Sequence, residues 1–124
     1  GEPHLDLGSL RLEDLRKTLQ EVLAAARAEP DLADSVAAPR INIRTKIALI
    51  FDALRRQGRM DFRELLRRSR SRLEVVVSFL AVLELIKQRQ GMAHQASPFE
   101  AIEIVPGAEG KPDQETELEL EFDE

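Results

Sequence analysis

The sequence predicts a mostly α-helical fold with a small β-wing, and three observations lead to this prediction. Apolar residues recur every three or four positions in several segments before residue 90, as they do on the buried faces of helices. Residues that begin or end helices stand at the borders of these segments. Two short extended runs follow residue 91, and the second alternates between apolar and polar residues. The order helix, helix, helix, strand, strand is that of a winged helix-turn-helix domain, which here follows an amphipathic helix.

The first element is that amphipathic helix, over residues 12–28. Its apolar residues form one stripe at spacings of three and four: Leu12, Leu15, Leu19, Val22, Leu23 and Ala26. Pro30 ends the helix, and the proline-containing segment that follows reads as a linker. We therefore expect three parts: residues 1–39 as helix and linker, residues 40–106 as the winged helix, and residues 107–124 as a disordered acidic tail.

Capping residues mark the three helices of the compact part. Asn42 is a candidate N-cap for a helix that ends before Gly58, which stands where a left-handed C-terminal residue is common. A short extended piece is expected near Met60. Asp61 opens a short helix with capping-box spacing, and Ser71 opens a long one in the same way. We expect the glycine at position 91 to stop that long helix.

Two strands are expected after the long helix. Residues 92–96 and 99–105 are the extended runs, separated by Ser97 and Pro98, so residues 96–99 would form the wing. Phe99 could lie either in the core or on the surface of this wing.

The long helix is unusually apolar for a DNA reader. On a helical wheel, eight of its apolar residues span about half of the circumference, which is enough for a core face: Leu73, Val75, Val76, Phe79, Leu80, Val82, Leu83 and Ile86. Three more, Val77, Ala81 and Leu85, align outside this arc and predict an exposed apolar stripe. Either a protein partner or the helix over residues 12–28 would cover this stripe.

The polar side of the same helix argues against base reading. A recognition helix presents Arg, Lys, Asn or Gln to base edges and phosphates. Here Glu74 and Glu84 lie on that side, and phosphates would repel them. An apolar stripe flanked by polar residues is typical of a protein contact.

Charge is distributed unevenly along the chain. Residues 40–72 contain eleven Arg or Lys against three acids, and residues 109–124 contain eight acids against one Lys. The basic block leaves nucleic-acid binding open as an alternative, although Arg-rich solvated helix faces are also common. The candidates for contact with the DNA backbone are Arg63, Arg67, Arg70 and Arg72.

No pattern in the chain indicates catalysis. Cysteine is absent, which excludes disulfides, thiol chemistry and cysteine-based zinc sites, and the two histidines, His4 and His94, lack the spacing of metal ligands. No secretory leader or membrane-spanning run is evident. We expect no enzyme activity, metal or cofactor. The chain begins with Gly1, so we expect a piece of a longer protein.

Four segments resemble one known family. The sequence RLEVVVSFLAVLELIK (residues 72–87) is similar to the signature helix of the bacterial segregation and condensation protein A family, the kleisins of the SMC complex. Residues 41–66 resemble that family's first two winged-helix helices, and residues 94–104 resemble its wing and final strand. Residues 10–25 resemble the helix that precedes the domain.

The resemblance implies a role in chromosome condensation and segregation. In the family, the C-terminal winged helix docks on the SMC ATPase head, and the middle segment binds a dimer of segregation and condensation protein B. The resemblance therefore implies a cytoplasmic, nucleoid-associated protein with at most weak, non-specific DNA contact and no membrane partner. The residues assigned to the SMC head are Val77, Ala81 and Leu85, with Ser78 and Glu84 at the rim and Phe99 beside them. Leu15, Leu19 and Val22 are assigned to the second partner.

Overall fold

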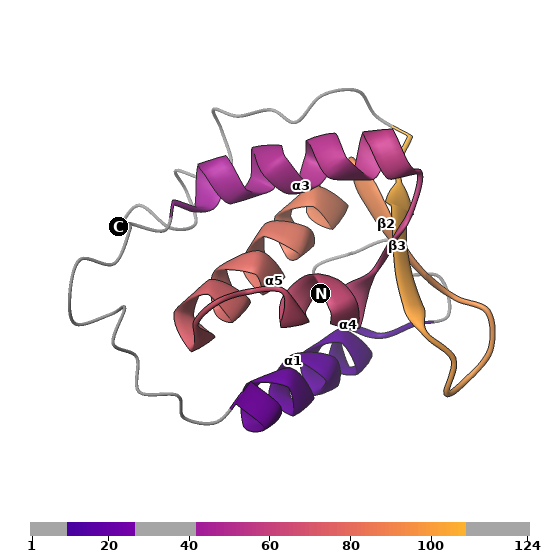
Figure 1. The fold of residues 1–124 in the computed structure, drawn as a ribbon. Coiled ribbons are helices and arrows are strands. Elements are labelled where there is room, and N and C mark those ends of the chain that lie inside the picture. The colour runs from indigo at the N-terminus through magenta and orange to yellow at the C-terminus, as the bar shows by residue number, and fades with distance from the viewer. Residues whose placement is uncertain (1–9, 27–41, 109–124) are drawn as a thin grey trace, which may run out of the picture.

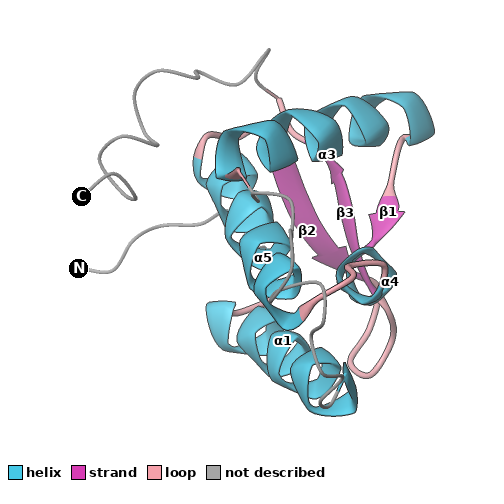
Figure 2. Ribbon diagram, turned by 60° about the vertical axis from the view of Figure 1, so that its left-hand side comes forward, coloured by secondary structure: helices cyan, strands magenta, loops and turns pink. Residues whose placement is uncertain are grey.

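A computed structural model describes residues 10–26 and 42–108, and it confirms the predicted fold class. Figures 1 and 2 show the helices packed around one small sheet. The elements are α1 (Leu12–Ala26), α3 (Ile43–Gln57), β1 (Met60–Asp61), α4 (Phe62–Arg67), α5 (Arg72–Lys87), β2 (Gly91–Gln95) and β3 (Ile102–Pro106). The sheet has the antiparallel order β1-β3-β2, as in a winged helix. The expected linker and most of the acidic tail lie outside the described residues.

The predicted caps are confirmed. Asn42, Asp61 and Ser71 each accept a backbone N–H from the first turn of the helix that follows, at 2.8–3.1 Å. These bonds satisfy donors that a helix start otherwise leaves without partners. Gly58 ends α3 with a left-handed φ of 84°, and its N–H donates to Leu54. These interactions are local, so they follow from the sequence.

The end of α5 differs from the prediction. The helix ends at Lys87, and Arg89 adopts the left-handed conformation with φ 64°, so Gly91 is not its stop signal. Gly91 instead begins β2, and a Cβ atom there would lie 3.6 Å from Ile104 and 3.7 Å from Leu54. These are ordinary van der Waals distances, so the packing of the sheet on α3 does not by itself require a glycine at this position.

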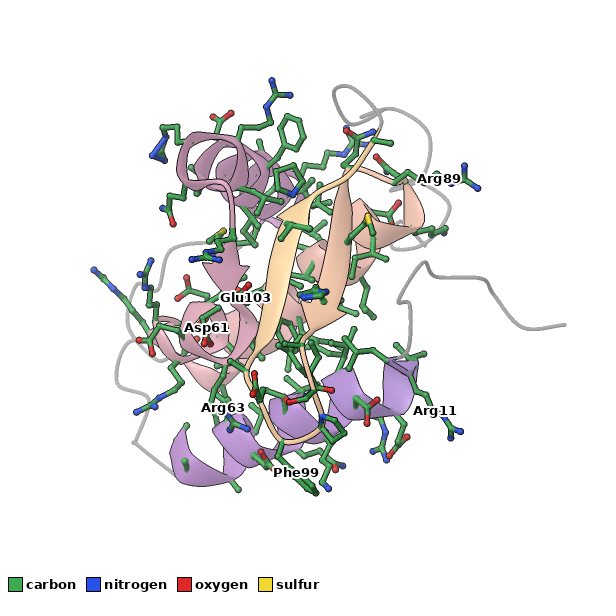
Figure 3. The ribbon with its side chains drawn as sticks, turned by 90° about the vertical axis from the view of Figure 1, so that its right-hand side faces the viewer. Arg11, Asp61, Arg63, Arg89, Phe99 and Glu103 are labelled. Atoms are coloured by element: carbon green, nitrogen blue, oxygen red, sulfur yellow. The ribbon has the colours of Figure 1, made fainter. Side chains whose placement is uncertain are left out.

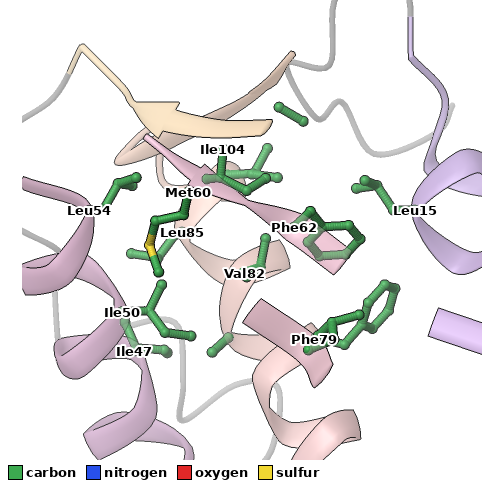
Figure 4. Close-up of a cluster of buried hydrophobic side chains, with 14 of the residues drawn as sticks. Leu15, Ile47, Ile50, Leu54, Met60, Phe62, Phe79, Val82, Leu85 and Ile104 are labelled. Atoms are coloured by element: carbon green, nitrogen blue, oxygen red, sulfur yellow. The ribbon is translucent and has the colours of Figure 1, made fainter. Parts of the chain in front are cut away.

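The core surrounds α5 and includes α1. Figure 4 shows side chains from α1, α3, α4, α5 and the sheet converging on one cluster. Leu15 and Val22 of α1 belong to this cluster, and Phe62 packs on Phe79 with ring centroids 6.2 Å apart. The helix before the winged helix is thus packed as part of the same unit. Across the described residues, no helix is long and apolar enough to cross a membrane.

Candidate protein-docking surface

Helix α5 has neighbours on most of its circumference. Lys46 Nζ of α3 donates to Glu74 at 2.6 Å, and Arg72 donates to the carbonyl of Leu23, near the end of α1, at 2.8 Å. α4 and β2 also pack against α5. Figure 2 shows α5 between α3 and α1, with the sheet on its inner side. Within residues 10–26 and 42–108, these neighbours leave one arc of the helix facing solvent.

The stripe expected to be exposed is buried. Ala81 and Leu85 have no exposed surface, and Ser78 and Glu84 are also buried. Val77 alone is half-buried. The expectation of an exposed stripe is therefore wrong, and a partner could not touch Ala81 or Leu85 in this fold.

The position of α3 explains the burial. Ser78, Ala81 and Leu85 follow Glu74 at spacings of four, three and four, so they share its flank of the helix. Glu74 is bonded to Lys46, which shows that this flank is the one nearest α3. Glu84 is buried at the margin of this flank, where its carboxylate accepts from Gln88 Nε2 at 2.8 Å.

The solvent-facing arc of α5 contains four residues that the wheel had assigned to the core, together with the exposed Lys87 in the last turn. Leu73 is 58% exposed, and Val76, Leu80 and Leu83 are half-buried. They follow one another at spacings of three, four and three, which places them on one side of the helix. We call these four residues the outer stripe. The core arc had the right width, but it was rotated relative to the true one.

Helix α1 continues this apolar surface. Arg72 at the start of α5 bonds the end of α1, so the two helices run side by side in opposite directions, as Figure 1 shows. Leu12 is exposed, and Leu19 and Leu23 are half-buried on the flank of α1 next to α5. Leu15 and Val22 are buried, so the expectation that they contact a second partner is wrong for both. Leu19 alone of those three keeps some exposure.

Phe99 lies elsewhere, at the tip of the wing. Its side chain is fully exposed at 102%, and its backbone is left-handed with φ 76°. Figure 3 shows it next to α1, where it lines a cleft of about 620 Å³ together with Asp14, Lys17 and Arg63. The lining of this cleft includes no α5 residue. Phe99 is therefore a surface residue, but not a neighbour of the α5 stripe as expected.

Two of the four candidate DNA-contacting arginines bind α1 instead. Arg63 lies 2.6 Å from Glu21, and Arg72 donates to Leu23. Arg67 and Arg70 are exposed. No periodicity in the sequence could reveal the first two contacts, because the partners lie more than 40 residues apart.

Comparison with known proteins gives a consistent result. The family model described as "Segregation and condensation protein ScpA" matches residues 10–106. A curated segregation and condensation protein A from Lactiplantibacillus plantarum is 35% identical over 103 residues, which cover 82% of this chain and 40% of the relative. The one from Caldanaerobacter subterraneus is 43% identical over 68 residues, which cover 54% of this chain and 28% of the relative. The one from Myxococcus xanthus is 30% identical over 110 residues, covering 87% and 37%. The chain thus spans less than half the length of these relatives. No solved structure matches the chain significantly.

Proposed function

Because this chain belongs to the segregation and condensation protein A family, we propose that it is part of a kleisin subunit of the SMC complex. In this role it contributes to chromosome segregation and condensation without catalysing a reaction. Its partners are the SMC ATPase head and a dimer of segregation and condensation protein B, in the cytoplasm at the nucleoid. We also propose that the chain has three parts, namely residues 1–39, 40–106 and 107–124. Helix α1 of the first part packs on the winged helix.

The observation that carries the proposal is the apolar outer stripe on α5. Leu73, Val76, Leu80 and Leu83 present aliphatic surface where a DNA reader would present donors, and Val77 lies at the margin of this surface. The centre of a protein interface is apolar and depleted of charge. We therefore place the contact with the SMC head on the outer stripe, and Leu12 and Leu23 extend it. Leu19 remains the candidate for contact with the B-protein dimer.

A pair of matched variants tests this assignment. Leu73 on α5 and Leu49 on α3 are both 58% exposed, so a charge at either site leaves the core intact. We expect Leu73→Arg to weaken binding to the cognate SMC head by about 2 kcal/mol or more, as at an interface hot spot, and Leu49→Arg to leave it nearly unchanged. The measurement is calorimetric titration of this chain with the isolated head. Equal affinities of the two variants would contradict the placement on the outer stripe.

DNA binding by the basic side is the second candidate, supported by the exposed Arg67 and Arg70. A salt titration separates the two functions. Binding to about six phosphates should weaken by orders of magnitude between about 50 and 200 mM salt. Docking through aliphatic side chains should depend on salt much less, because screening acts on charges.

A further inference from the structure

Five exposed arginines lie at the C-terminal ends of α3 and α4 and just before β1. Arg55 and Arg56 occupy the last turn of α3, Arg59 precedes β1, and Arg67 and Arg68 lie at the end of α4. All five side chains are exposed, and none of them belongs to α5. We call these five residues the basic band. Figure 3 shows nitrogen-tipped side chains along these elements.

Asp52, Asp61 and Glu64 are exposed on the same elements, so the carboxylates of the described residues compensate the five charges of the basic band only in part. Within residues 10–26 and 42–108, Arg59 alone of the five has an ion-pair partner, Glu103, at 3.9 Å. Arg55 instead lies over the ring of Phe51, 5.7 Å from its centroid. Five cations raise the local potential and attract a polyanion.

The chain itself contains a polyanion of suitable length. Residues 109–124 contain eight acids and one lysine, a net charge of −7. Sixteen extended residues can span up to about 50 Å, whereas the six residues of α4 measure about 9 Å along the helix axis. This segment is several times longer than α4, one of the elements that carry the basic band.

The last described residues of β3 lie close to α3. Pro106 at the end of β3 pairs with Gly91, and a Cβ atom on Gly91 would lie 3.7 Å from the side chain of Leu54. Leu54 directly precedes Arg55 in the last turns of α3. The connection to residue 109 therefore begins on the part of the sheet that packs against the last turns of α3, where the N–H of Gly107 donates to the carbonyl of Gln90 at 3.0 Å.

We propose that residues 109–124 dock along the basic band and shield it from other polyanions, nucleic acid included. Because the segment is tethered, its effective concentration at the band is of the order of millimolar, so weak charge pairs suffice to hold it. The contact is electrostatic, and salt at about 1 M, where the Debye length is about 3 Å, should release it. This shielding is independent of docking through the outer stripe.

The absence of cysteine allows a direct test in the full chain. A single cysteine in place of Glu121 (Glu121→Cys) can carry a nitroxide spin label without competing sites. At low salt we expect broadening of the backbone amide signals of residues 55–59 and 67–68, and recovery of these signals at about 1 M salt. A control chain with the other acids of residues 109–124 changed to their amides should show no broadening. Broadening confined to residues 104–108, or broadening that survives in the control chain, overturns the proposal.

A competition experiment tests the shielding. A chain that ends at Ala108 should bind a short DNA duplex at about 50 mM salt at least about tenfold more tightly than the full chain. Arg56→Glu in the shortened chain should remove most of this gain. Arg11→Glu makes the same charge change just before α1, outside the band, and should remove little. Equal affinity of the full and shortened chains, or equal losses from the two substitutions, overturns the shielding.

Discussion

The guanidinium of Arg63 on α4 lies 2.6 Å from the carboxylate of Glu21 on α1, and both side chains remain about half exposed. Arg72 makes a second bridge, from the first turn of α5 to the carbonyl of Leu23. The two arginines thus contact the C-terminal half of α1 from α4 and from α5. Side chains that a DNA-binding winged helix would direct at phosphates are used here within the protein.

The bridge between Arg63 and Glu21 should contribute little to stability, because exposed ion pairs gain modest energy in water. A double-mutant cycle with Arg63→Ala and Glu21→Ala should give a coupling of about 0.2–1 kcal/mol in the free energy of unfolding. The coupling should shrink at about 1 M salt, where charges are screened. Urea denaturation followed by circular dichroism measures it. A coupling that is independent of salt would show that the pair does not act through charge.

The apolar side of α1 should matter far more than this bridge. Leu15 has no exposed surface, so Leu15→Ala should lower the free energy of unfolding by about 2–5 kcal/mol, as for other buried leucines. Leu12 is 43% exposed on the same helix, and Leu12→Ala should cost less than about 1 kcal/mol. Similar losses from the two substitutions would mean that α1 is not anchored through Leu15.

The sequence was sufficient for features that depend on near neighbours in the chain. The caps at Asn42, Asp61 and Ser71 and the left-handed Gly58 all follow from side chains within a few residues. The small wing and its strands follow from alternation and turn residues in the same way.

Which side of α5 is buried and which is exposed could not be predicted from near neighbours in the chain. A helix with apolar residues on every side gives no preferred direction, so periodicity could not decide which arc meets α3 and which meets solvent. That choice depends on where α1 and α3 pack. The contacts of Arg63 and Arg72 with α1 were hidden for the same reason, because they join segments far apart in the chain.

Leu85 was expected to be an exposed contact residue, but the rotation of α5 relative to the predicted wheel buries it. With no exposed surface, Leu85 cannot accept a charge, so Leu85→Arg should unfold the domain rather than selectively abolish a contact. Leu73→Arg should keep a native helical spectrum and a melting temperature close to that of the wild type, because this position is exposed. Thermal melts followed by circular dichroism compare the two. A folded Leu85→Arg variant would show that α3 does not cover this flank.

Glu74 connects three elements at the start of α5. Its carboxylate accepts from Lys46 Nζ at 2.6 Å and from the backbone N–H of Arg70 at 2.8 Å, and about a quarter of its side chain is exposed. Burial acts to raise the pKa of Glu74, but the hydrogen bonds from Lys46 and Arg70 outweigh it and lower the pKa below its ordinary value.

This lowered pKa predicts how stability depends on pH. A carboxyl group whose pKa is lower in the folded than in the unfolded state stabilises the fold above its unfolded pKa. That contribution is lost as the pH falls through the folded pKa. Glu74→Gln should therefore cost about 1.5–3 kcal/mol at neutral pH, the range for hydrogen bonds to charged groups. The cost should diminish below the ordinary glutamate pKa of 4.5. Urea midpoints measured from neutral to acidic pH test this, with Lys46→Met as the control background. In the Lys46→Met background, Glu74→Gln should lower the free energy of unfolding by less at neutral pH. An unchanged cost would assign the effect to the Arg70 N–H alone.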